Sequence, residues 1–119
     1  NDLPHINNLI EQINQCTKLQ NIPIKEDAYK YIHQTQLFIN EYKFNNNINM
    51  FIRKYCRNFI FLMKSIMKNY FSLIHNFKDT KQHYNIKNIL VTIITYDVTN
   101  NELFLLQLII KLYDLWFNN

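Results

Sequence analysis

The alternation of apolar and polar positions along the chain predicts helices. Near the start, apolar residues recur every three or four positions, which is the period of one helix face, at Ile6, Leu9, Ile10, Ile13 and Leu19. This pattern predicts a first helix over about residues 4 to 20. Pro23 then breaks the pattern. The acidic pair Glu26 and Asp27 is typical of the first turn of a new helix, because the helix dipole stabilises carboxylates there.

The second helix is expected to run from about residue 25 to Phe44. Its predicted buried positions are Ala28, Tyr31, Ile32, either Leu37 or Phe38, and Tyr42. Residues 45 to 47 are all Asn, whose side chain competes with helical hydrogen bonds, so we expect a loop there.

Residues 49 to 75 are predicted to form a third helix, with a break near Asn58 as an alternative. Apolar positions occupy most of its circumference, which is typical of a central helix. They are Phe59, Ile60, Leu62, Met63, Ile66, Met67, Tyr70, Phe71 and Ile74.

The polar stretch from residue 76 to 84 predicts a connection, followed by a helix over about residues 85 to 95. The β-branched run from 89 to 95 could also form a buried strand, but a lone strand would lack a partner, so we favour a helix. Thr99 or Asn100, with Glu102 behind it, is expected to cap a last helix that ends at Phe117. The sequence therefore predicts one all-α domain over residues 1–119.

Composition supports a packed domain and excludes one class of enzyme. The chain has 119 residues and a mass of 14.6 kDa, with 48% hydrophobic and only 18% charged residues, so it must bury a sizeable core. Glycine is absent, which excludes the Gly-rich loops of nucleotide-binding enzymes. Asn is expected to form helix ends and turns instead. The chain begins without Met or a signal-like segment, so we expect a domain excised from a longer protein.

The longest apolar segment, from Leu103 to Phe117, is interrupted by Gln107, Lys111 and Asp114. We therefore expect no transmembrane segment.

Residues that could perform catalysis or bind metal do not cluster in the sequence. Cys16 and Cys56 lack the spacing of a zinc or redox site, so we expect free thiols in a reducing compartment, with a single disulfide as the alternative. Four histidines, His5, His33, His75 and His83, stand alone, and the acidic residues are dispersed. We therefore expect no enzymatic activity, no cofactor, no metal and no small-molecule substrate.

The charge distribution points to an anionic partner. The net charge is +4 and the pI is near 9.1, and the basic residues concentrate between Arg53 and Lys87. A solvated lysine surface is the simplest interpretation, and a phosphate-bearing partner is the alternative. On a helix, Arg57, Lys64 and Lys68 would share one stripe, with Ser65 beside them.

Residues 61 to 69, Phe-Leu-Met-Lys-Ser-Ile-Met-Lys-Asn, carry a family resemblance. They resemble the motif Leu-Tyr-x-Leu-Asp-Ser-Ile-x-Lys-Asn of the CTD-interacting domains, helical modules that bind the phosphorylated C-terminal repeats of RNA polymerase II. The final helix pair, with Trp116 near its end, is similar to the closing helices of that family. More weakly, residues 16 to 19 followed by Ala28 are similar to an upstream helix of the family.

The resemblance implies a right-handed superhelix of five to eight helices, similar to the ENTH and VHS domains. It also implies a nuclear protein that binds a phosphorylated peptide of the polymerase tail and couples transcription to RNA 3′-end processing or termination. The implied peptide-binding residues are Phe61, Lys64, Ser65, Lys68 and Asn69. One departure stands out, because Lys64 occupies the position of the family's Asp, so that a hydrogen-bond acceptor has become a cation.

Three other interpretations stay open. Residues 22 to 24 and 97 to 108 resemble parts of the N-terminal domain of the elongation factor TFIIS. An adaptor of the ENTH or VHS kind would use the basic face on anionic lipid or cargo tails. Packing inside a larger assembly is the third. RNA binding is less favoured, because the aromatic residues fall at core spacing.

Overall fold

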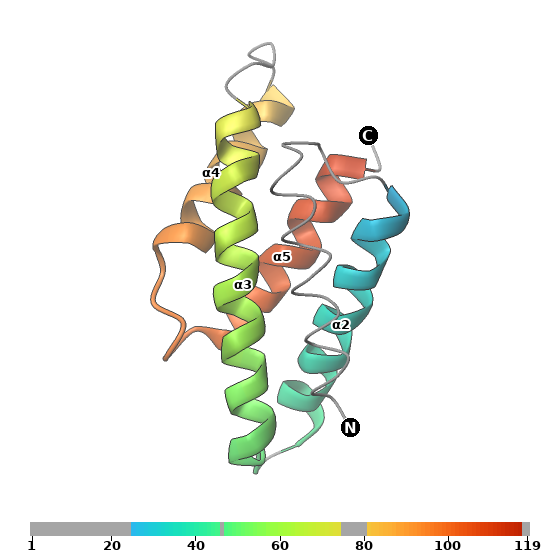
Figure 1. Cartoon of the computed structure of the whole chain (residues 1–119), viewed down its shortest axis with the longest axis vertical. Helices are drawn as coiled ribbons and strands as arrows, with labels where there is room; N and C mark the ends of the chain where they lie inside the picture. The colour runs from blue at the N-terminus through green and yellow to red at the C-terminus, as the bar shows by residue number, and fades with distance from the viewer. Residues whose placement is uncertain (1–24, 46, 75–80, 118–119) are drawn as a thin grey trace.

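The computed structural model describes residues 25–45, 47–74 and 81–117 (Figure 1). These residues form four helices: α2 (Lys25–Phe44), α3 (Met50–Ile74), α4 (Lys81–Thr95) and α5 (Glu102–Phe117). Within the described ranges there is no strand. The all-α prediction is therefore confirmed for the described residues, which contain four helices where five to eight were expected for the whole chain. The first predicted helix, residues 4 to 20, lies outside the described residues.

Helix α5 occupies the centre of the bundle. It packs against α2, α3 and α4, and in Figure 1 it crosses behind α3 and then runs between α3 and α2. Its fully buried side chains form one broad face, and they are Glu102, Leu105, Leu106, Ile109, Leu112 and Tyr113. Burying one Leu or Ile side chain fully stabilises a fold by roughly 1.5 to 3 kcal/mol, so α5 contributes a large share of the core energy.

The prediction of a helix over residues 49 to 75 is confirmed, but α3 is less central than expected, because it packs mainly against two helices while α5 packs against three. Helix α3 packs against α4 and α5 with one face, where Phe59, Ile60, Met63 and Met67 are fully buried, and leaves its opposite face to solvent. Phe61 on that opposite face is 56% exposed. The many apolar residues on the sides of α3 misled the prediction.

Helix α2 follows the prediction closely. Its bounds are those expected, Ala28 and Tyr31 are buried, and Ile32 and Tyr42 are partly buried. Of the two alternatives, Phe38 is the buried residue, and it packs on Phe59 of α3 with 5.6 Å between ring centroids.

The remaining helix boundaries correct the prediction in three places. Helix α3 is continuous through Asn58. Helix α4 begins at Lys81, four residues before the expected start, and it includes the β-branched run that could have been a strand. Helix α5 begins after Asn101, whose carbonyl accepts the amide of Leu105 at 2.8 Å, so the cap is neither Thr99 nor Asn100.

Asparagine also begins α3. The side-chain Oδ1 of Asn49 accepts the backbone N–H of Phe51 at 2.9 Å, and its carbonyl accepts the N–H of Arg53 at 3.0 Å. The side-chain contact satisfies an amide of the first turn that has no partner within the helix, and the carbonyl contact is the first regular hydrogen bond of α3. Asn49 therefore fixes where α3 starts.

A search of the described helices for a stretch long and apolar enough to cross a membrane found none.

Candidate peptide-binding surface

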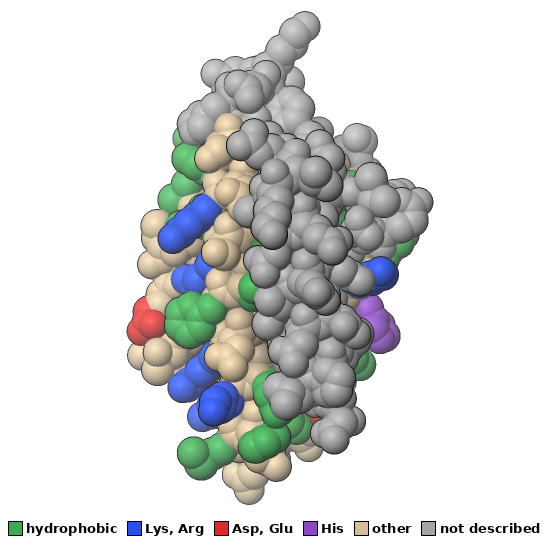
Figure 2. Space-filling view, in the orientation of Figure 1, with side chains coloured by type: hydrophobic (Ala, Val, Ile, Leu, Met, Phe, Trp, Pro, Cys, Tyr) green, Lys and Arg blue, Asp and Glu red, His purple; other side chains and the backbone are tan. Residues whose placement is uncertain are grey.

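The solvent-facing side of α3 carries an exposed aromatic residue between cations. We call Lys54, Asn58, Phe61, Ser65 and Lys68 the outer face of α3, since all five are exposed and recur every three or four residues. Figure 2 shows Lys and Arg side chains spread along α3 with hydrophobic side chains between them. Such a surface offers charge and apolar contact to the same ligand.

A shallow depression of about 670 Å³ lies over the N-terminal half of this helix. Of the described residues, seven line it: Met50, Phe51, Arg53, Lys54, Arg57, Asn58 and Phe61. Met50 and Phe51 are 85% and 63% exposed, so the depression combines accessible apolar surface with three cationic side chains.

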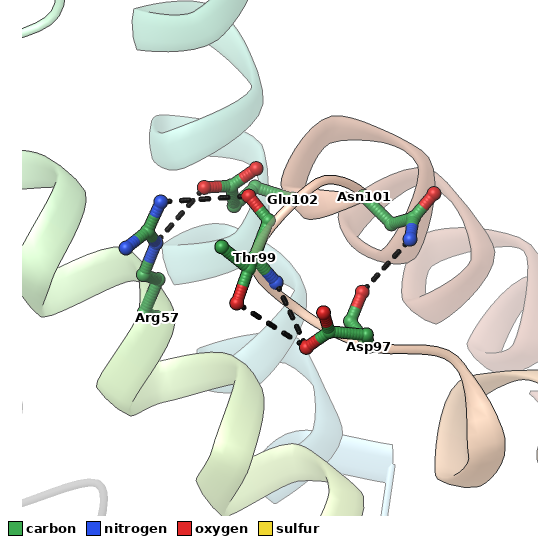
Figure 3. A network of polar contacts seen from close by, with 5 residues as sticks. All are labelled: Arg57, Asp97, Thr99, Asn101 and Glu102. Atoms are coloured by element: carbon green, nitrogen blue, oxygen red, sulfur yellow. Dashed lines mark hydrogen bonds and ion pairs between the residues drawn. The ribbon is translucent and has the colours of Figure 1, made fainter.

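Arg57 is engaged inside the protein. Its Nε donates to Oε1 of Glu102 at 2.9 Å, and its Nη2 donates to the carbonyl of Thr99 at 3.4 Å (Figure 3). The Glu102 side chain is only 10% exposed and lies in the first turn of α5, where the helix dipole also favours a carboxylate. The pair therefore fastens α3 to the start of α5 and leaves Arg57 little charge to offer a ligand.

The α4–α5 loop beside Arg57 is held by its own polar contacts. Oδ1 of Asp97 accepts the backbone N–H of Thr99 at 3.3 Å and its hydroxyl at 3.2 Å, and Nδ2 of Asn101 donates to the Asp97 carbonyl at 2.8 Å (Figure 3). These contacts form a compact turn. The loop thus presents ordered carbonyl groups to α3.

Lys64 binds the end of α4. Its Nζ donates to the carbonyl of Ile94 at 3.4 Å and also to the carbonyl of Tyr96. These carbonyls lie at the C-terminus of α4, where the last acceptors of a helix have no partner within it and a cation is favoured. Partial burial lowers the pKa of Lys64, and Lys68 adds to this effect while Asp97 opposes it. Lys64 therefore has an internal role.

The sequence-derived site residues fall into two groups. Phe61, Ser65 and Lys68 are exposed on the outer face, and Asn69 is half-buried at its margin. Lys64 lies on the same side of α3 but donates to the α4 carbonyls. The motif therefore places four of its five residues on one accessible surface.

Sequence reasoning missed Lys54 and Asn58, which extend the same face toward the start of α3. A signal for both was present, because Lys54 precedes Phe61, and Asn58 precedes Ser65, by the same seven residues that separate Phe61 from Lys68.

The described part of the chain offers no metal site, since no group of three or more His, Cys, Asp or Glu side chains converges there. Cys56 is fully buried, and this burial raises the pKa of its thiol to about 12. Burial also raises the pKa of Tyr42, and the neighbouring Cys56 adds to that rise. Both groups are therefore neutral and unreactive at physiological pH. Cys16 lies outside the described residues.

No protein-family model, curated protein or solved structure matches the chain.

Proposed function

We propose that this chain is a non-enzymatic interaction module that binds an extended phosphorylated peptide along the outer face of α3. The observation that carries the proposal is the exposed Phe61, 56% accessible, with the exposed cations Lys54 and Lys68 on either side of it along one helix. An aromatic side chain gives apolar contact area, and lysines attract phosphate as point charges.

The motif of residues 61 to 69 supports a closer assignment. We propose that the chain is a divergent member of the CTD-interacting domains, that its helices belong to a right-handed superhelix, and that its ligand is the phosphorylated tail of RNA polymerase II in the nucleus. In this proposal Lys64, which replaces an acceptor of the family, stabilises α4 instead of contacting the peptide. Loss of that acceptor then changes which groups of the peptide are recognised, while the outer face of α3 can still bind the peptide.

The proposal is tested by titrating fluorescein-labelled repeat peptides, unphosphorylated and phosphorylated at each Ser, and following fluorescence anisotropy. We expect saturable binding of at least one phosphorylated peptide and weaker binding by Phe61→Ser. Tyr84→Ser is the matched control, because Tyr84 is 64% exposed and belongs to α4 instead of α3. It should bind like the wild type.

Two results would contradict the proposal. One is the absence of saturable binding to any peptide while circular dichroism shows intact helices. The other is sedimentation with anionic vesicles in place of peptide binding, which would favour the adaptor interpretation, since Met50 and Phe51 are exposed beside Arg53 and Lys54.

A further inference from the structure

Three side chains of the outer face recur at intervals of seven residues. Lys54, Phe61 and Lys68 all lie within the uninterrupted helix α3. Seven residues fall only about 20° short of two full helical turns, so the three side chains lie nearly in line. At about 1.5 Å per residue, the two lysines are ~21 Å apart along the axis and Phe61 lies midway.

The two cations of this line differ from two other cations of α3, Arg57 and Lys64, whose charged groups are bound within the protein. Arg57 pairs with Glu102, and Lys64 donates to α4 carbonyls. Lys54 and Lys68 are exposed and make no hydrogen bond or ion pair with another described side chain. A ligand phosphate would therefore meet a cation at each end of the line.

Uncharged hydrogen-bonding groups lie along one flank of the same line. Asn58 and Ser65 are exposed and Asn69 is half-buried, at spacings of seven and four residues. An extended peptide carries backbone N–H and C=O groups that need partners once water is displaced. Amide and hydroxyl side chains can both donate to and accept from such a backbone.

We infer that the outer face of α3 selects a peptide with two phosphates about seven residues apart and an apolar side chain midway between them. The inference rests on the proposed function and names its ligand more closely. An extended chain advances ~3.3 Å per residue and a polyproline II chain ~3.1 Å, so ~21 Å corresponds to six or seven residues. At physiological salt, charges so far apart are screened from each other, and each phosphate is bound locally.

The test is a ladder of peptides of equal length and equal charge, in which the second phosphoserine lies three, seven or eleven positions after the first and one Phe occupies a position next to the midpoint. A singly phosphorylated peptide is the reference. We expect the seven-residue spacing to bind on the order of tenfold more tightly than the reference, because the second phosphate binds at high effective concentration. The shorter and longer spacings should gain little affinity over the reference. A short spacing cannot reach both lysines, and the residues between the phosphates of a long spacing must bulge away from the helix.

Lys54→Met and Lys68→Met should each lower the affinity for the doubly phosphorylated peptide to that for the singly phosphorylated one. Lys111→Met is the control, because this substitution removes the same charge from an exposed residue of α5 that lies outside the line. Equal affinity across the ladder would overturn the spacing inference while leaving the proposed function intact. Absence of binding by every phosphopeptide would overturn both.

Discussion

Replacing Lys64 with Met should destabilise the fold without weakening peptide binding. Met keeps most of the alkyl chain of Lys64 but removes the ammonium that donates to the carbonyls of Ile94 and Tyr96. A hydrogen bond from a charged donor stabilises a protein by about 1.5 to 3 kcal/mol, and a cation at a helix C-terminus adds about 0.3 to 1 kcal/mol.

These gains are reduced by the cost of removing the ammonium from water, which is the cause of the lowered pKa of Lys64. We therefore expect Lys64→Met to lower the free energy of unfolding by about 1 to 2 kcal/mol. For a domain of this size, that corresponds to a decrease in Tm of roughly 5 °C.

The assay is urea denaturation followed by circular dichroism at 222 nm, with phosphopeptide affinity measured on the same samples. Lys68→Met is the matched control, because Lys68 is exposed on the same helix and should change stability by less than about 0.5 kcal/mol while weakening binding. The reasoning would be refuted if Lys64→Met were as stable as the wild type, or if it lost binding as Lys68→Met does.

Three further predictions concern the interior. Arg57→Met leaves the nearly buried Glu102 carboxylate unpaired and should cost about 2 kcal/mol, more than Glu102→Gln; a double-mutant cycle that finds no coupling would contradict the ion pair. In a Cys16→Ser background, Cys56 should react with an aromatic disulfide reagent only after unfolding, and rapid labelling of the native protein would show that the thiol is accessible. Because the pKa of Cys56 rises from 9.0 to about 12 on folding, stability should fall as pH rises from 9 toward 12, by roughly 3 kcal/mol at pH 11 from this thiol. The raised pKa of Tyr42 adds to this loss of stability above pH 10, and the lowered pKa of Lys64 opposes it. Cys56→Ala should therefore make the free energy of unfolding fall less steeply with pH.

Local patterns in the sequence predicted what depends on neighbours along the chain. The bounds of α2 followed from Pro23, the acidic first turn and the run of Asn, and residues 89 to 95 were correctly favoured as a helix. The placement of Phe61, Ser65 and Lys68 on one face followed from helical periodicity alone.

Contacts between distant segments could not be predicted in this way. Lys64 meets the end of α4 about thirty residues later, and no local pattern distinguishes a lysine that caps another helix from one that faces a ligand. Arg57 likewise depends on Glu102, which lies 45 residues away. The central place of α5 also depends on tertiary packing, because α3 and α5 are both rich in apolar residues.

The role of the α3 outer face as the peptide surface is tested most directly by a ¹⁵N chemical-shift titration of the full chain with the phosphopeptide of seven-residue spacing. We predict saturable shifts for the amides of Lys54, Phe61, Ser65 and Lys68, with those of Tyr84 and Lys111 unchanged. Saturable binding that shifts α4 or α5 amides and leaves the outer face of α3 unchanged would contradict the account.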